Sequence, residues 1–290
     1  MECAMYPEAE TVYRRILEVC QHVLGLDHCQ TGETLNDLAL LLWCQGRYQE
    51  AEPYYQQALT ICEQSVGPVH SVVLHIRHNL AVLYQEQGKY TLAEQLFQET
   101  ASTREKVLGP MHPSVAESLQ GLAFTCISQQ RLNEAEGLSH WALSIRRQVL
   151  GEDHPSVAQS LTHLGKLYAT RGELSQGQAF LWQAITIREK RLGPNHPKLA
   201  ICLNALGDIY LAQGQYEQAE TLLQRAWSIR EQTLSPGHSH RAESLYSLAQ
   251  LFIAQGAFEQ AEPLLQQARE IVEHAFGPDH PFIKGVCKVM

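Results

Sequence analysis

Histidine recurs every 42 residues along the whole chain. The column consists of His28, His70, His112, His154, His196, His238 and His280. Glycine stands three places before six of these histidines, and Ser235 fills the remaining slot. A fixed period between about 20 and 50 residues is typical of stacked-repeat proteins, in which each unit contacts only its neighbours. The sequence therefore predicts a solenoid with a long surface rather than a fold built around one pocket.

Each repeat reads as two helices joined by a tight turn. In the repeat that begins at His196, Leu199, Leu203 and Leu206 follow the spacing of one helical face. A break at residues 213–215 separates them from a second run with the same spacing. The pattern predicts a first helix of about 15 residues and a second helix of about 19.

Further columns mark the helix ends and the close contacts. Pro197 suits the first position of a helix, and Gly193 suits a left-handed residue after the preceding helix. The turn between the helices carries glycine in most repeats, with Gln130 as the exception. Arg77 stands where the other five repeats have leucine, so either its side chain extends outward or its repeat is locally distorted. Small residues recur where paired helices would approach closely: Ala39, Ala81, Ala123, Gly165, Gly207 and Ala249.

Composition narrows the classes of function. The formal net charge of −9 argues against a general affinity for nucleic acids or anionic membranes. No apolar run is long enough to span a bilayer, and the N-terminus lacks a signal pattern. The eight cysteines form no CxxC pair, so we expect reduced thiols and a cytoplasmic location.

The repeating polar residues do not predict catalysis. Stacked units lie about 10 Å apart, whereas zinc–nitrogen bonds are about 2 Å long, so two histidines of the column cannot share an ion. We expect these histidines to cap or anchor the first helices. Glutamates near the start of the second helices, such as Glu94, suit the helix dipole better than a catalytic pair. The sequence has no phosphate-binding loop, GxSxG or HExxH motif. We therefore expect no catalytic residue, no metal and no cofactor.

The Leu-Ala/Gly pair, the turn glycine and a later alanine column resemble the tetratricopeptide repeat. The 42-residue length and the stretch IRE-x-x-LG-P-x-HP from Ile187 to Pro197 resemble its kinesin light chain-like subclass. The resemblance implies an all-α, right-handed α-solenoid whose first helices line a concave wall. Residues 25–276 would hold six complete repeats. Residues 1–24 would be the second helix of a truncated repeat, and residues 277–290 the start of another.

The resemblance also implies that the concave groove binds a partner. Large apolar side chains such as Trp43 are expected in the first three repeats. One column of amides and imidazoles is placed to hydrogen-bond a peptide backbone, and it consists of Asn36, His78, Gln120 and Asn204. A solvated groove is the alternative for any single residue. Acids outnumber the single Lys166 on this side, so an acidic partner motif is poorly matched. The candidate residues are Glu33, Asn36, Leu40, Trp43, His75, His78, Val82, Glu117, Gln120, Phe124, Gln159, Thr162, Lys166, Asn204, Asp208 and Tyr246.

The sequence thus favours a non-catalytic scaffold that binds a peptide or protein segment in its concave groove. Two alternatives remain open. The repeats could be a sensor or autoinhibitory arm of a larger signalling protein, such as a nucleotide-triphosphate switch or a protease. They could also associate end to end through uncapped terminal helices. No nucleic acid or membrane partner is expected.

Overall fold

The computed structural model describes residues 6–278, 280, 282, 283 and 285. These residues form thirteen α-helices and no strand. The chain begins with α1 (Tyr6–Val23), and the first helices of the repeats follow as α2 (Cys29–Cys44), α4 (Ser71–Glu86), α6 (Pro113–Ser128), α8 (Pro155–Thr170), α10 (Pro197–Ala212) and α12 (Ser239–Ala254). The second helices are α3 (Tyr48–Val66), α5 (Tyr90–Leu108), α7 (Leu132–Leu150), α9 (Leu174–Leu192), α11 (Tyr216–Thr233) and α13 (Phe258–Phe276).

The helix lengths confirm the predicted pairs. Each first helix has 16 residues. Each second helix has 19 residues except α11, which has 18. The expected start of a further repeat at 277–290 lies largely outside the described residues.

The histidine column caps the first helices, as predicted. In each complete repeat the histidine is extended, and its Nδ1 accepts a hydrogen bond from the backbone amide two residues later. His112, for example, accepts from Ser114 at 3.1 Å. The bond satisfies one of the amides that a helix start leaves without an intrahelical partner. The imidazoles therefore have a structural role that accounts for their period.

Two glycine columns adopt positive φ. Gly193, which follows α9, has φ 88° and ψ 167°, so it lies in a region open essentially only to glycine rather than in the left-handed helical region. The turn column has φ between 73° and 83°. Gln130 takes the place of the turn glycine in its repeat and has φ 64°. It is the only non-glycine residue with positive φ in the described chain. The turn geometry is thus the same in that repeat although the residue type is not.

Arg77 does not distort its repeat. Helix α4 runs without a break, and the Arg77 guanidinium forms an ion pair with Glu63 of α3 at 2.6 Å. The leucine of the other repeats is therefore replaced here by an ion pair that links neighbouring units.

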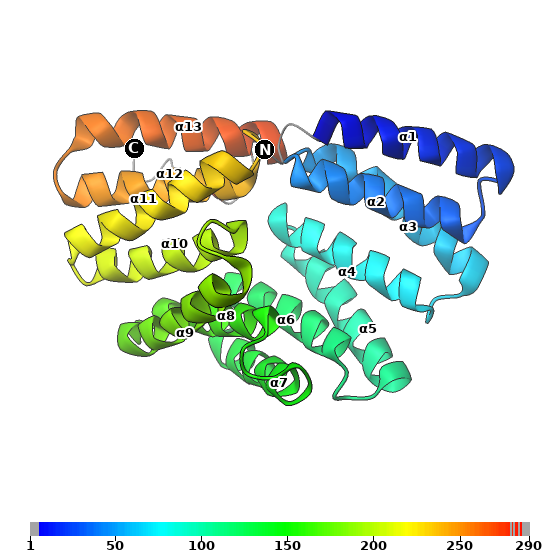
Figure 1. The fold of residues 1–290 in the computed structure, drawn as a ribbon, viewed down its shortest axis with the longest axis horizontal. Coiled ribbons are helices and arrows are strands. Elements are labelled where there is room, and N and C mark those ends of the chain that lie inside the picture. The colour runs from blue at the N-terminus through cyan, green and yellow to red at the C-terminus, as the bar shows by residue number, and fades with distance from the viewer. Residues whose placement is uncertain (1–5, 279, 281, 284, 286–290) are drawn as a thin grey trace.

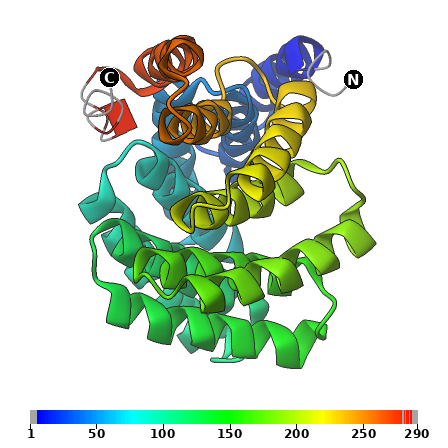
Figure 2. The same cartoon turned by 90° about the vertical axis from the view of Figure 1, so that its left-hand side faces the viewer.

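Consecutive first helices pack directly against one another, whereas the second helices of consecutive units have few contacts or none. The first helices consequently lie on the inside of a curve, and the second helices form its outer layer. Figure 1 shows this curve bending until α12 and α13 meet α2 and α3 end to end, and Figure 2 shows the same region from the side.

The two ends of the curve touch, so the solenoid closes into a ring. The Tyr48 hydroxyl lies 2.9 Å from the Ser239 hydroxyl, and the Tyr48 and Phe276 rings are stacked with centroids 4.4 Å apart. Nε2 of His280 lies 2.8 Å from the backbone carbonyl of Glu86. Gly46 faces the backbone of Gly237 so closely that a Cβ on Gly46 would lie 2.3 Å from the carbonyl oxygen. We call these contacts the closure contacts.

Candidate functional site

Three neighbouring cavities are hollowed into the inner wall of the ring. The first, the amide cavity, has a volume of about 360 Å³ and lies between α4, α6 and α8. The second, the apolar cavity, of about 420 Å³, lies between α6, α8 and α10. The third, the charged cavity, of about 200 Å³, lies between α8, α10 and α12. Lys166, Ala205 and Asp208 border both the apolar and the charged cavity, so these two adjoin.

The amide cavity contains polar atoms that find no partner among the described residues. These are Nδ1 of His78, Nδ1 of His163, and both amide atoms of Gln120, which is 1% exposed. Burial, assisted by the charge of Arg104, lowers the pKa of His78 to about 3. Burial, assisted by Lys166, lowers the pKa of His163 to about 3 as well. Both rings are therefore neutral near pH 7, and each has one donor and one acceptor to offer.

A buried arginine also borders the amide cavity. Arg146 extends from the second helix α7 and is only 1% exposed. Its guanidinium donates to the Ser156 carbonyl at 3.0 Å and to the Ser160 hydroxyl at 2.8 Å, and no carboxylate of the described residues forms an ion pair with it. Burial lowers the pKa of Arg146 to about 10, so it remains charged at neutral pH. The cavity thus combines this cation with the Glu117 carboxylate and with neutral imidazoles and amides.

Arg146 belongs to a column of buried arginines that our sequence analysis missed. Arg104, Arg146, Arg188 and Arg230 each donate to the backbone carbonyl ten residues further on, at the start of the next first helix. Each also donates to a side chain fourteen residues further on. The column ties each second helix to the following unit. Its signal in the sequence was the arginine that recurs every 42 residues from Arg104 to Arg230, at the position of Arg188 in the IRE stretch.

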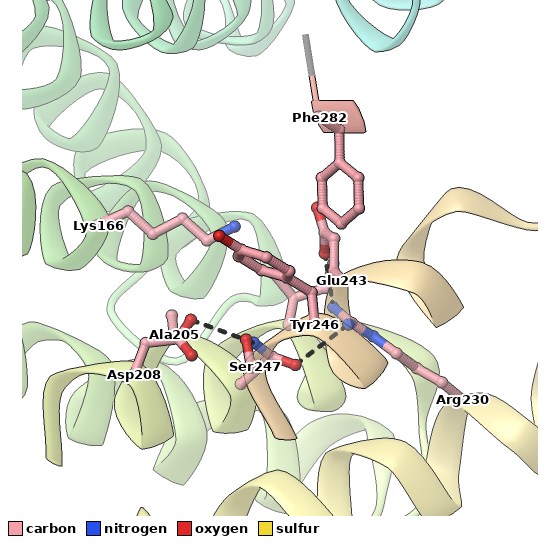
Figure 3. Close-up of a pocket in the computed structure, with 10 residues that line it drawn as sticks. Lys166, Ala205, Asp208, Arg230, Glu243, Tyr246, Ser247 and Phe282 are labelled. Atoms are coloured by element: carbon pink, nitrogen blue, oxygen red, sulfur yellow. Dashed lines mark hydrogen bonds and ion pairs between the residues drawn. The ribbon is translucent and has the colours of Figure 1, made fainter. Parts of the chain in front are cut away.

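The charged cavity holds a hydrogen-bonded network of opposite charges (Figure 3). Arg230 forms an ion pair with Glu243 at 3.0 Å, and the Asn204 amide donates to the Ser247 hydroxyl at 2.9 Å and to Asp208 at 3.2 Å. Burial raises the pKa of Asp208. Burial would also raise the pKa of Glu243, but His240 and Arg230 outweigh it and lower that pKa to about 2. Tyr246 and Phe282 pack edge to face at the rim, with ring centroids 5.2 Å apart.

The structure places eleven of the sixteen candidate residues at these cavities. His75, His78, Val82, Glu117, Gln120 and Gln159 line the amide cavity. Phe124 and Lys166 line the apolar cavity, and Lys166, Asn204, Asp208 and Tyr246 line the charged one. The others, which line none of the three, are Glu33, Asn36, Leu40, Trp43 and Thr162.

Several candidates already have partners within the chain. Asn36 is 5% exposed and accepts from Asn79 at 3.0 Å. Thr162 donates to the Ala158 carbonyl at 2.7 Å. Trp43 packs edge to face against Tyr48 and His238 at the closure contacts. Of the amides in the predicted backbone-binding column, Gln120 alone has no partner among the described residues.

The apolar lining lies further along the chain than the sequence indicated. Phe124 and Ile127 of α6 join Ala169 of α8 and Ile209 of α10 in the apolar cavity. Leu40 is instead 41% exposed away from the three cavities. The apolar part of the wall therefore belongs to the third to fifth repeats.

The described residues contain no helix long and apolar enough to cross a membrane. Within the same residues no three His, Cys, Asp or Glu side chains are grouped to hold a metal ion.

The sequence matches the tetratricopeptide repeat family over residues 2–64, 72–148, 121–190, 172–232 and 203–274. The chain belongs to the tetratricopeptide repeat family. Repeats of this family are generally non-catalytic scaffolds. Among curated proteins, none is significantly similar to this chain in sequence.

Solved tetratricopeptide structures show which subclass it resembles. Nearly identical repeats assigned to a kinesin light chain of Podosopora anserina are 30% identical to this chain, with a TM-score of 0.51 over 69% of this chain and 94% of that chain. BtubC (BKLC) from P. vanneervenii is 20% identical, with a TM-score of 0.56 over 82% of this chain and 94% of that chain. A Rap protein complexed with Competence and Sporulation Factor is 12% identical, with a TM-score of 0.64 over 100% of this chain and 87% of that chain. These tetratricopeptide repeats are thus of the kinesin light chain-like type, and the last two likenesses concern the fold alone.

Proposed function

We propose that this tetratricopeptide protein is a non-catalytic scaffold that holds an extended segment of another protein along the inner wall of its ring. The observation that carries the proposal is the set of unpartnered polar atoms of His78, Gln120 and His163 in one cavity. Buried polar groups in folded proteins almost always have hydrogen-bond partners. A ligand that supplies these bonds, once the side chains rotate toward the cavity, would therefore gain affinity.

The chemistry of the amide cavity matches a peptide backbone. Neutral imidazoles and amides each offer both a donor and an acceptor, as peptide groups do. Asn79, Gln85 and Gln159 add further amides to the lining. The apolar cavity next to it supplies a place for one or two apolar side chains of the same segment.

Arg146 adds a preference for an acidic residue at this point of the segment. The Arg146 guanidinium interacts electrostatically with Glu117 but forms no ion pair with it, and a carboxylate from the ligand would add charge-assisted hydrogen bonds. The proposal departs from the expectation that an acidic motif is poorly matched, because Arg146 reaches the cavity from the second helix and not from the groove-facing positions of the first.

The Rap complex supports the proposal in a general way. A protein of this fold has been crystallised with Competence and Sporulation Factor, so the fold is compatible with such a complex. The proposal for this chain rests on its own cavity residues.

A displayed library of random peptides tests the proposal. The wild-type protein should enrich peptides with an acidic residue near apolar ones, and the double variant Gln120→Leu, His163→Leu should lose them by at least about tenfold in affinity. Gln98→Leu, on the exposed face of α5, is the matched control and should bind as the wild type does. Circular dichroism shows whether each variant remains folded. Equal affinity for the folded double variant and the control would exclude the amide cavity as the binding site.

A further inference from the structure

Two cysteine thiols lie next to each other in the first complete repeat. Sγ of Cys29 lies 3.3 Å from Sγ of Cys62. Cys29 is the first residue of α2, and Cys62 lies near the end of α3. The two thiols therefore lie at the open end of the α2–α3 hairpin, opposite the turn at Gly46. Cys62 is fully buried, whereas Cys29 is half-buried and reachable from solvent.

Three columns of the repeat depart from the other units at this place. The position of Cys29 is proline or serine in the other complete repeats, and the position of Gly32 is alanine or leucine. The position of Cys62 is the buried arginine in four other repeats. A Cβ on Gly32 would lie 2.5 Å from Sγ of Cys62, so glycine makes the space that the thiol occupies. All three departures serve the same contact between α2 and α3.

We propose that Cys29 and Cys62 are a reversible dithiol–disulfide pair that locks the first repeat when oxidised. A disulfide bond is about 2.05 Å long, so the two sulfurs need to approach by about 1 Å. Cys29 is the first residue of α2, so a shift of this helix end can supply the approach. The proposal is independent of the proposed function.

The oxidation balances with glutathione disulfide as the oxidant. The Cys29 thiolate attacks one sulfur of glutathione disulfide, whose S–S bond breaks and releases one glutathione thiolate. Cys62 then attacks the Cys29 sulfur of this mixed disulfide and releases the second glutathione. The protons of the two protein thiols leave with the two glutathiones. Burial, followed by the hydrogen bond with Cys29, raises the pKa of Cys62 to about 12, which makes Cys29 the residue that reacts first.

The disulfide would affect the part of the ring that carries the closure contacts. Helix α3 begins at Tyr48, whose hydroxyl bonds to Ser239, and the turn before it contains Gly46. Local opening of the hairpin would separate α2 from α3 and would disturb these contacts. A covalent link across the open end of the hairpin restricts that opening.

Equilibration in glutathione redox buffers tests the proposal. After alkylation of the remaining thiols, peptide mapping of the wild-type protein should show a 29–62 crosslink that dithiothreitol removes. The oxidised protein should have a higher Tm than the reduced protein. Cys29→Ser should abolish both effects. Gly32→Ala should disfavour the crosslink by about tenfold or more, because the new methyl group displaces the Cys62 sulfur.

Gly137→Ala is the matched control, because a Cβ at Gly137 meets nothing within 4 Å. It should leave the crosslink as in the wild type. The proposal would be overturned if both cysteines were alkylated in excess glutathione disulfide, if glutathione remained on Cys29, or if Cys62 paired with another cysteine.

Discussion

Tyr48 stacks on Phe276 with the two ring planes 15° from parallel, although one residue starts α3 and the other ends α13. Tyr48 is fully buried by this contact and by Ser239 and His238. The first and last complete repeats therefore share a small core of their own, and the inner wall is enclosed around its circumference. This distinguishes the chain from an open solenoid, whose two ends are far apart.

Gly46→Ala should open the ring. The new Cβ would lie 2.3 Å from the Gly237 carbonyl oxygen, so the two ends have to separate. Small-angle X-ray scattering should show a larger radius of gyration. Gly214→Ala is the control, because Gly214 has a similar φ of 73° but no atom within 4 Å of a Cβ. It should lose about 1 kcal/mol from backbone strain and keep the wild-type radius. Identical scattering from the two variants would contradict closure.

Gln130→Gly should stabilise the protein by about 0.5–1 kcal/mol. A non-glycine residue at positive φ costs about 1–2 kcal/mol, which exceeds the entropy that glycine loses on folding. The urea midpoint should rise without a change in slope. Gln213→Gly serves as the comparison, because Gln213 has φ −86° and gains nothing from glycine. That substitution should lower the midpoint.

His154→Ala should destabilise the protein by about 1 kcal/mol, because the Ser156 amide loses the cap that Nδ1 supplies at 3.1 Å. The effect should concentrate in the first turn of α8, where amide hydrogen exchange should become faster. His154→Asn should recover most of the loss, since asparagine is also a good cap. Equal stability of the alanine variant and the wild type would show that the histidine column has another purpose.

The protein should lose stability on acidification partly through His78 and His163. Their folded pKa values of about 3 lie below the usual value of 6.5, so the unfolded chain binds more protons as the pH falls. Their contribution is complete above pH 6.5 and decreases from there toward pH 3. Between pH 7 and pH 5 each should account for about 2 kcal/mol of the loss.

Urea unfolding at both pH values measures this effect. His163→Gln should reduce the loss of unfolding free energy by that amount, whereas Gln98→Leu should retain the wild-type pH dependence. An unchanged dependence in His163→Gln would show that its ring is accessible to protons in the folded state.

The period of the sequence predicted most of the fold. It located both helices of each repeat, the histidine caps and the turn that Gln130 shares with glycine, because each of these depends on contacts within one unit or with its neighbour. Closure was not predictable in this way. Tyr48 and Ser239 occupy unrelated columns, and their contact depends on curvature summed over all units.

The candidate site was predicted in position more than in chemistry. Gln120 and His78 face the hollow as expected, whereas Asn36 and Asn204 bond to neighbouring helices. The positive charge at the amide cavity was missed because only first-helix columns were considered, and Arg146 reaches the wall from α7. A search for polar residues repeated on the apolar face of the second helix would have found it.

Closure has a consequence for how such a chain can vary. An open solenoid gains or loses whole units at little cost, because each addition only lengthens the stack. Here a duplicated or deleted 42-residue unit would displace Ser239 and Phe276 from Tyr48. The closure contacts therefore constrain how many repeats the chain can hold.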